Sequence, residues 1–329
     1  MRKIWWTWDV RTRWARGFSG SADAFVANYR AALDAAAGYG VEGLVIWGFL
    51  RDRHGGVEAA RQVCDYAGER GVMILPGMGI DSYGGAWYEG DSPWSLNTYL
   101  AENPGARALD ENGEPQLQRW PPSDTSRRYV GCPADEGLMD YYRASVEWLL
   151  ETFDLRGLQV EQGDVALCHC ERCRGRTRTD VAKMAGRTCL EDLAGRVGPV
   201  VSHALARRPE LTVIVENYSG MLPADTDRAA PFLRDFPDAA YHSWQAYDAV
   251  GKFFIDEGSR SPRPHGCLAV RTNSDAFGGE LEDCGNIRRA IALARGAGLD
   301  MTYIYGEYPD DWPKTRANYQ AWAQAAAED

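Results

Sequence analysis

Residues 43–48 read GLVIWG, a continuous apolar run, and a helical pattern over 56–71 separates them from a second apolar run, VMILP, at 72–76. Short apolar runs without polar alternation are typical of strands that are buried on both faces, as in parallel sheets. The order of strand, helix and strand therefore indicates an α/β fold built on a parallel sheet.

The same alternation continues along the whole chain. Apolar runs predict eight strands, at 3–9, 43–48, 72–76, 158–161, 211–216, 239–244, 267–271 and 301–305. Eight units in 329 residues average about 41 residues each, which is typical of a (β/α)8 TIM barrel with decorated loops. A doubly wound sheet is the alternative, but it usually carries a glycine-rich first turn, which this sequence lacks. We therefore predict one (β/α)8 barrel domain over residues 1–329.

Three segments carry features beyond the barrel pattern. Residues 79–134 contain Gly, Pro, Trp and Tyr without clear periodicity, and they are too long for a plain connection. They predict an insertion after strand three that lies over the C-terminal mouth of the barrel. A cysteine-rich loop follows strand four, and residues 177–207 read as a long helical region.

Composition limits the classes of partner. The chain has 36 Lys and Arg against 47 Asp and Glu, a net charge of −11, which disfavours nucleic acid and anionic membranes as partners. No apolar stretch approaches the length of a membrane span, and the first residues lack a signal-peptide pattern. We expect a cytoplasmic protein whose partner is a small carbohydrate or glycoside, with its oligomeric state left open.

Acids and aromatic residues follow the predicted strands. Glu161 and Glu216 each close an apolar run, although Glu is a poor strand residue, and Asp164 and Glu307 lie just beyond strands four and eight. In TIM barrels the chemistry lies at these C-terminal strand ends. Several carboxylates at one mouth, with only five His in the chain, suit glycoside hydrolysis, which needs one acid and one nucleophile or base.

Cys168, Cys170 and Cys173 form the most specific local motif. Three thiolates within six residues can wrap a tetrahedral Zn²⁺, and a structural site needs a fourth ligand. Cys132 is the best candidate, and His169 is the alternative, although it is sterically awkward between two other ligands. Four ligands leave no open position, so the site is predicted to be structural. The remaining cysteines, Cys64, Cys189, Cys267 and Cys284, read as small buried residues.

Residues 126–173 resemble the family-42 β-galactosidases and related barrel glycosidases. In that family a strand-four Glu is the acid/base, and a C-x-C-x-x-C run with an upstream Cys binds zinc. The resemblance implies that Glu161 is the acid/base and that Cys132, Cys168, Cys170 and Cys173 bind zinc. Two departures are that Val160 replaces the family's Asn, and that strand seven ends at 271–273 without the family's nucleophilic Glu.

The leading hypothesis is a glycoside hydrolase in which Glu161 is the general acid/base. Glu307 is the first candidate for the second carboxylate because it follows strand eight, opposite strand four, and Glu216 on the neighbouring strand is the second. Asp164 is a further candidate, on the same loop as Glu161. The predicted substrate-wall residues are Asp9, Trp47, Tyr218, Trp244 and Arg271. The alternatives are a catalytically silent barrel that binds carbohydrate, and a sugar isomerase or lyase on the same fold.

Overall fold

The computed structural model describes residues 1–9, 19–118, 128–162, 167–176, 180–183, 186–216, 231–248, 252–253, 255–270, 282–305 and 313–328. Within them, eight parallel strands form a closed barrel. In chain order they are β1 (Arg2–Trp8), β2 (Gly43–Trp47), β3 (Met73–Gly79), β4 (Gly157–Glu161), β7 (Thr212–Glu216), β8 (Tyr241–Asp248), β10 (Gly266–Val270) and β11 (Met301–Tyr305). Each strand pairs with the next, β11 pairs with β1, and the pairing of β8 with β10 completes the closure. The predicted TIM barrel and all eight predicted strands are confirmed.

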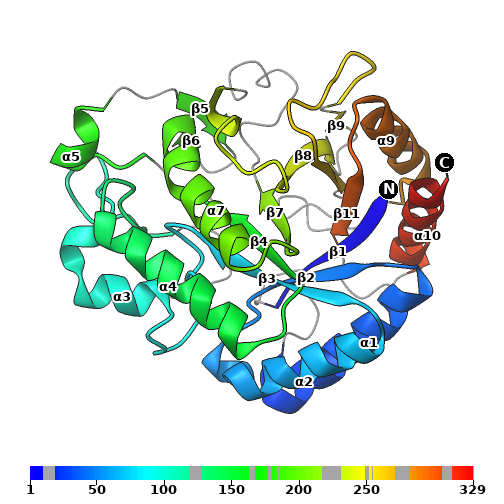
Figure 1. Cartoon of the computed structure of the whole chain (residues 1–329), viewed down its shortest axis with the longest axis horizontal. Coiled ribbons are helices and arrows are strands. Elements are labelled where there is room, and N and C mark those ends of the chain that lie inside the picture. Colours follow the sequence, from blue (N-terminus) through cyan, green and yellow to red (C-terminus); the bar gives the residue numbers. More distant parts are fainter. Residues whose placement is uncertain are drawn as a thin grey trace.

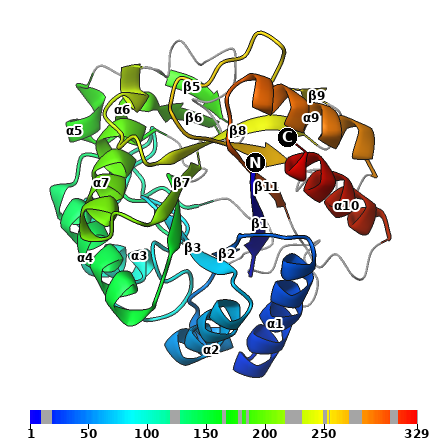
Figure 2. The same ribbon diagram turned by 45° about the vertical axis from the view of Figure 1, so that its right-hand side comes forward.

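Helices lie around this barrel (Figure 1). The longer ones are α1 (Ala22–Gly38), α2 (Gly56–Glu69), α4 (Glu136–Thr152), α7 (Gly198–Arg207), α9 (Cys284–Gly296) and α10 (Pro313–Ala327). The Ser21 hydroxyl accepts the backbone N–H of Ala24 and begins α1, and the Asp135 carboxylate accepts that of Leu138 and begins α4. The two termini lie side by side (Figure 2), because the amino group of Met1 donates to the carbonyl of Ala326 at the end of α10.

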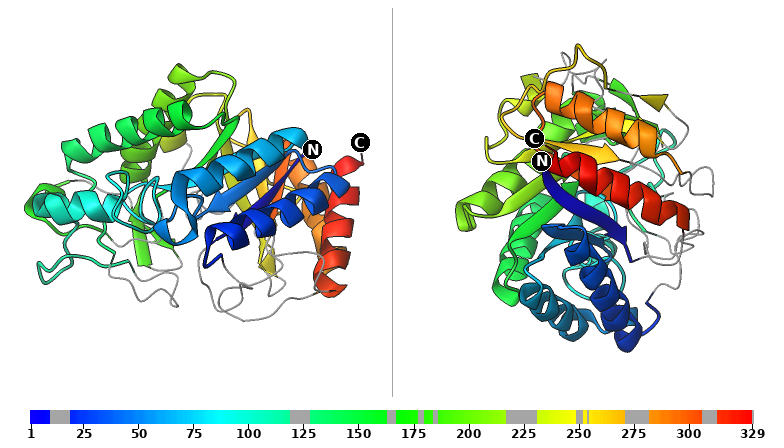
Figure 3. Two further views of the ribbon diagram at one scale, coloured as in Figure 1. Left: turned by 90° about the horizontal axis from the view of Figure 1, so that it is seen from below. Right: turned by 90° about the vertical axis from the view of Figure 1, so that its right-hand side faces the viewer.

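Shorter elements decorate the loops. They are η1 (Asp52–His54), α3 (Leu96–Glu102), η2 (Pro104–Ala106), α5 (Glu171–Arg174), β5 (Asp180–Lys183), β6 (Gly186–Cys189), α6 (Leu190–Asp192), η3 (Leu193–Val197, a π-helix) and β9 (Lys252–Phe253). The elements α3 and α5 lie at the end of the molecule away from both termini (Figure 3, left). No helix in the described ranges is both long and apolar enough to cross a membrane.

The predicted helical region 177–207 is partly wrong. Residues 180–183 and 186–189 pair as the antiparallel strands β5 and β6, and helix begins only at Leu190. Val181 and Thr188 are β-branched, and Gly186 starts the second strand, so local propensity favours a hairpin over a helix. The predicted insertion follows β3, and its described residues are 80–118 and 128–134. Its Tyr83 contacts the rings of Trp8 and Trp47 at the C-terminal ends of β1 and β2.

Two large apolar clusters make the core of the barrel, apart from a small cluster at the cysteines. The larger one lies between the barrel and its helices, and the smaller one fills the barrel interior with alternate residues of the strands, among them Trp6, Trp47, Ile214 and Tyr303. This alternation places every second side chain of a strand inside the barrel. The register of each strand therefore decides which polar side chains meet within it.

Candidate active site and candidate metal centre

Glu161 and Glu216 end two neighbouring strands. Glu161 is the last residue of β4, Glu216 is the last residue of β7, and the two are direct register partners. In-register residues of parallel strands project to the same face, and neighbouring strands lie about 4.8 Å apart. Gln159 lies two residues before Glu161 and hydrogen-bonds inside the barrel, so Glu161 projects inward as well. Both glutamates are buried, with exposed fractions of 4% and 2%.

Donors from the barrel wall hold the carboxylate of Glu216. The Tyr303 hydroxyl lies 2.6 Å from Oε1 and 2.5 Å from Oε2 and shares its one hydrogen with this carboxylate, and Gln159 Nε2 donates to Oε2 at 3.0 Å. The indole N–H groups of Trp6 and Trp47 donate to Gln159 Oε1 at 2.8 Å and 2.6 Å. Because both indoles are donors, they orient the Gln159 amide with its N–H₂ group toward Glu216. Burial, followed by the charge of Glu216, raises the pKa of Tyr303 well above its usual value, which keeps the hydroxyl a donor.

Aromatic rings surround this end of the barrel. Trp8, at the end of β1, is half-buried, and its ring lies 5.9 Å from that of Trp6, 5.7 Å from Tyr83 and 6.5 Å from Tyr88. The ring of Trp6 lies 4.3 Å from that of Tyr305. Trp8, Tyr83 and Tyr88 are not among the predicted site residues, although Trp8 follows the inward-facing Trp6 by two positions. That spacing is the signal that places it on the inner face of β1.

Asp9 belongs to a buried charged cluster just after β1. Its carboxylate accepts a hydrogen bond from the Ser19 hydroxyl at 2.8 Å and lies 3.6 Å from the Arg51 guanidinium, which also pairs with Glu89 at 2.6 Å. Burial raises the pKa of Asp9 to about 6, against the lowering effects of Ser19 and Arg51. Burial lowers the pKa of the adjacent His54 to about 4, so this imidazole is neutral at pH 7. The cluster joins the end of β1 to the segment after β2.

The structure does not bring together all the predicted wall residues. Trp47 faces the barrel interior, and its N–H is engaged by Gln159. Trp244 packs instead into the core between barrel and helices, with 1% of its surface exposed. The reason is that β8 extends to Asp248, so Trp244 is a mid-strand residue on the outer face and does not end its strand. Four further predicted site residues lie outside the described ranges: Asp164, Glu307, Tyr218 and Arg271.

The four predicted cysteine ligands lie together. The Sγ atom of Cys132 is 3.6 Å from that of Cys170 and 3.7 Å from those of Cys168 and Cys173. All four sulfur atoms lie within 4.8 Å of one another. Tetrahedral metal–sulfur bonds of about 2.3 Å place sulfurs about 3.8 Å apart, so these thiols fit one metal ion. The cluster found among the described residues consists of the four thiols and does not include His169.

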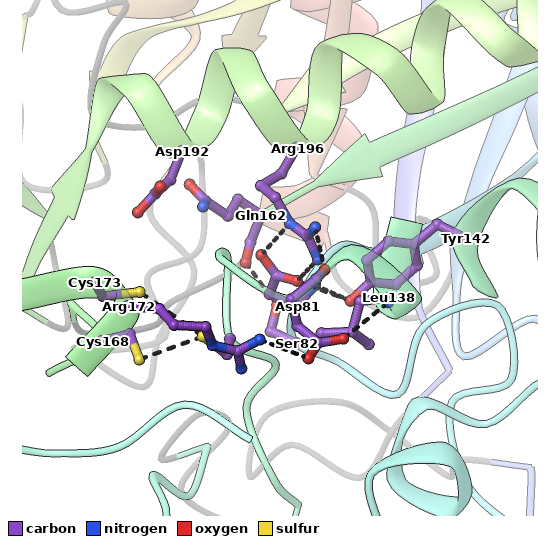
Figure 4. A network of polar contacts seen from close by, with 12 residues as sticks. Asp81, Ser82, Leu138, Tyr142, Gln162, Cys168, Arg172, Cys173, Asp192 and Arg196 are labelled. Carbon is purple, nitrogen blue, oxygen red and sulfur yellow. Dashed lines mark hydrogen bonds and ion pairs between the residues drawn. The ribbon is translucent and has the colours of Figure 1, made fainter. Parts of the chain in front are cut away.

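Backbone and arginine N–H groups surround the thiols. The N–H of Leu109 points at Cys168 Sγ at 3.4 Å, and the Arg176 guanidinium points at Cys173 Sγ at 3.5 Å. Arg172, which lies beside Cys168 and Cys173 (Figure 4), pairs with Asp135 at 3.1 Å. Donors of this kind stabilise thiolates and orient them, as the outer shell of a metal site does. The set can therefore hold a soft metal ion, and it leaves no position open for a substrate.

A cavity of about 540 Å³ lies elsewhere, between α2 and the end of α4. Met73 at the start of β3, Cys64, Asp154 and Arg156 contribute to its wall. These residues flank the N-terminal ends of the strands, opposite to the end that carries Glu161 and Glu216. In TIM barrels that rim serves stability and the other rim serves catalysis, so we place the candidate site at the two glutamates.

The sequence matches no protein-family model and no curated protein. Solved structures of glycoside hydrolases are similar in fold. A glycoside hydrolase family 20 β-N-acetylglucosaminidase has a TM-score of 0.51 at 14% identity, over 97% of this chain and 68% of that one. A β-N-acetylhexosaminidase from Bacteroides fragilis has a TM-score of 0.58 at 10% identity, over 98% and 65%. The PgaB (BpsB) glycoside hydrolase domain from Bordetella bronchiseptica has a TM-score of 0.56 at 10% identity, over 98% of both chains.

The chain thus spans about two thirds of the first two proteins and nearly all of the third. At such low identities the likeness concerns the fold alone. The fold of this chain is the TIM barrel on which those glycoside hydrolases are built.

Proposed function

We propose that this chain is a glycoside hydrolase with Glu161 as its general acid/base. The observation that carries the proposal is the pair of buried glutamates in register at the C-terminal ends of β4 and β7. Glycoside hydrolysis requires two carboxyl groups, one to protonate the leaving oxygen and one to act as nucleophile or base. The fold shared with known glycoside hydrolases supports the same assignment.

The surroundings of the two glutamates suggest a division of roles. Glu216 accepts hydrogen bonds from Tyr303 and Gln159, and both partners are donors, which suits a group that works as a carboxylate. Glu161 is then the group that exchanges a proton with the leaving oxygen. Register partners on adjacent strands hold their carboxyl groups on the order of 5 Å apart, which is the separation of retaining enzymes. Glu307 stays the alternative second carboxylate, and it is tested in parallel.

A small carbohydrate or glycoside is the proposed substrate. The half-buried ring of Trp8 offers a flat apolar face close to the glutamates' end of the barrel, and the buried rings of Tyr83 and Tyr88 pack against it edge-on. The carbon-bound hydrogens of a pyranose pack well on such faces, while its hydroxyls need polar partners. The predicted wall residues Asp9, Tyr218 and Arg271 remain candidates for that polar recognition.

We further propose that Cys132, Cys168, Cys170 and Cys173 hold a structural zinc ion. Four thiols with tetrahedral spacing and no open position fit Zn²⁺ better than a hard, oxygen-preferring cation. The same cysteine pattern carries the resemblance to the family-42 β-galactosidases, and membership of that family is part of this proposal. The metal holds loops in this proposal and takes no part in bond cleavage.

A panel of chromogenic aryl glycosides tests the enzymatic proposal. Wild-type protein should hydrolyse at least one of them, and Glu161→Gln should lower its turnover at least about a hundredfold with unchanged metal content. Substrates with acidic leaving groups should lose least, because they need little protonation. Glu42→Gln is the matched control, since this carboxylate pairs with Arg2 at the opposite rim of the barrel.

Two results would contradict the proposal. Hydrolysis by Glu161→Gln at the wild-type rate would place the acid elsewhere. Binding of glycosides without hydrolysis of any of them would instead identify a catalytically silent carbohydrate-binding barrel. Variants Glu216→Gln and Glu307→Gln, assayed on the same substrates, distinguish the two candidates for the second carboxylate.

A further inference from the structure

Asp81 lies two residues beyond β3 in a conformation that few residues other than glycine adopt. Its φ is +65°, in the left-handed region, and its side chain is almost fully buried. Gly79 permits the turn, since a Cβ there would meet the carbonyl oxygen of Ser82 at 2.0 Å. A buried acid in a left-handed conformation persists only where the surroundings hold it in place.

Contacts from three directions hold Asp81 (Figure 4). Its Oδ1 accepts hydrogen bonds from Arg196 Nη2 at 2.9 Å and from the Tyr142 hydroxyl at 3.0 Å. Its backbone N–H donates to the Tyr142 hydroxyl at 2.7 Å, and its carbonyl accepts the N–H of Gly131 at 2.8 Å. Side chain and backbone are both engaged, so neither can shift without breaking a buried contact.

The residues on either side of Asp81 hold the end of β4. The N–H of Ile80 donates to the carbonyl of Glu161 at 2.7 Å, and the Ser82 hydroxyl donates to the carbonyl of Gln162 at 2.8 Å. Residues 80–82 therefore hold two consecutive carbonyls at the point where the Glu161 side chain leaves the backbone. A rotation at Asp81 would move both contacts together.

Arg196 ties this arrangement to the loops around it. Its guanidinium is 5% exposed, and besides Asp81 it contacts the carbonyl of Asp135 through Nη1 at 3.0 Å. Arg196 belongs to the π-helix η3, a rare local structure that is frequent at functional sites. Asp135 in turn begins α4 and pairs with Arg172 of the cysteine loop.

We propose that Asp81, held by Arg196, is a positioning residue that sets the orientation of the Glu161 carboxyl group. This inference rests on the proposed role of Glu161 as acid/base. Buried ion pairs add little to stability compared with apolar packing, and in some proteins they instead specify one geometry. Here the pair specifies the turn whose two flanking residues hold the backbone of Glu161 and Gln162.

A double-mutant cycle with Asp81→Asn and Glu161→Gln tests the proposal. Asn tolerates the left-handed conformation but cannot pair with Arg196 as an ion. We expect Asp81→Asn to lower kcat about tenfold with little change in KM, since a small misplacement of a reacting group is costly. The loss should be larger for glycosides with poor leaving groups, and the alkaline limb of the pH profile, where the general acid loses its proton, should shift. The double variant should be no slower than Glu161→Gln alone, because Asp81 acts through Glu161.

The control is Asp238→Asn, which removes the ion pair with Arg263 outside the mouth and should leave kcat and the pH profile unchanged. Should Asp81→Asn fail to fold, Arg196→Lys is the second variant, because it keeps the positive charge but lacks the planar guanidinium group. Its kcat, KM and pH profile are measured in the same way. The positioning role would be overturned if the losses of kcat in the two single variants added up in the double variant. It would also be overturned if Asp81→Asn had the wild-type kcat and pH profile. Full activity of Glu161→Gln would instead overturn the proposed function itself.

Discussion

Replacing Cys132 by Ala should release the cysteine loop from the rest of the protein. Cys132 is the one cluster ligand that precedes α4, whereas Cys168, Cys170 and Cys173 lie together in the loop after β4. A metal bound by all four joins the two segments. Without Cys132 a metal ion held by the other three would bind within a single loop and link nothing.

The size of the effect follows from the loop that the metal closes. Cys132 and Cys168 are 36 residues apart in sequence. Treated like a covalent cross-link, closure of a loop of this length removes unfolded-state entropy worth about 4 kcal/mol at 25 °C. With an unfolding entropy of about 2.1 cal/mol/K per residue, that free energy corresponds to a fall in Tm of about 6 °C for a chain of this length.

Metal analysis and thermal unfolding check this expectation together. Wild-type protein should hold about one zinc per chain after dialysis against a weak chelator, and Cys132→Ala should lose it and melt at lower temperature. Cys64→Ala is the matched control, because burial raises the pKa of that thiol to about 12 and it lies far from the cluster in the α2 region. A Cys132→Ala protein that keeps its zinc and its Tm would refute the assignment.

Two further substitutions test buried polar side chains of the barrel strands, Tyr303 inside the barrel and His242 on the outer face of β8. Tyr303→Phe removes the donor that reaches Glu216 from β11, and if Glu216 is the second carboxylate, steady-state kinetics should show kcat/KM reduced at least about tenfold in a folded protein. His242→Phe tests how the free energy of unfolding depends on pH. Burial lowers the pKa of His242 to about 3, so the unfolded chain binds more protons between pH 3 and 6.5 and stability rises with pH across that window. This histidine alone should make the wild-type protein about 2 kcal/mol less stable toward unfolding at pH 5 than at pH 7. Urea unfolding of both proteins at the two pH values should show that His242→Phe lacks this contribution.

Hydrophobic pattern was sufficient to predict the barrel. Strands such as β2 are buried along their whole length, so their apolar runs are continuous and easily distinguished from helical periodicity. In the structure Ser21 and Asp135 begin α1 and α4, where a side-chain oxygen satisfies an otherwise unpaired backbone N–H. The cysteine cluster was also predictable, because ligand spacing is written directly in the sequence.

The interior partners of the glutamates were not predictable in the same way. Tyr303 and Glu216 are 87 residues apart and meet only because their strands face each other inside a closed barrel of a particular register. An error of a few residues in a predicted strand boundary also leads to a wrong prediction of where a side chain lies. The predicted strand six stops at Trp244, whereas β8 continues to Asp248, and this difference moves Trp244 from the mouth to the outer core. The hydrophobic pattern of the sequence shows where a strand lies, but which side chains meet across the barrel depends on the register of the paired strands.

The position of the cysteine cluster gives the proposed metal ion a structural role in the proposed hydrolase. The loops around the cluster have only a small core of their own, made of the described residues Ala108, Val130 and three of the cysteines. So few apolar side chains contribute little to the order of the stretches that carry the cysteines, and a metal cross-link is the usual substitute in such places. These loops lead directly to Gly131 and Asp135, which contact Asp81 and Arg196, and through them to the end of β4. Loss of the metal should therefore displace the Glu161 carboxyl group without changing its chemistry. We expect kcat to fall while the barrel stays folded.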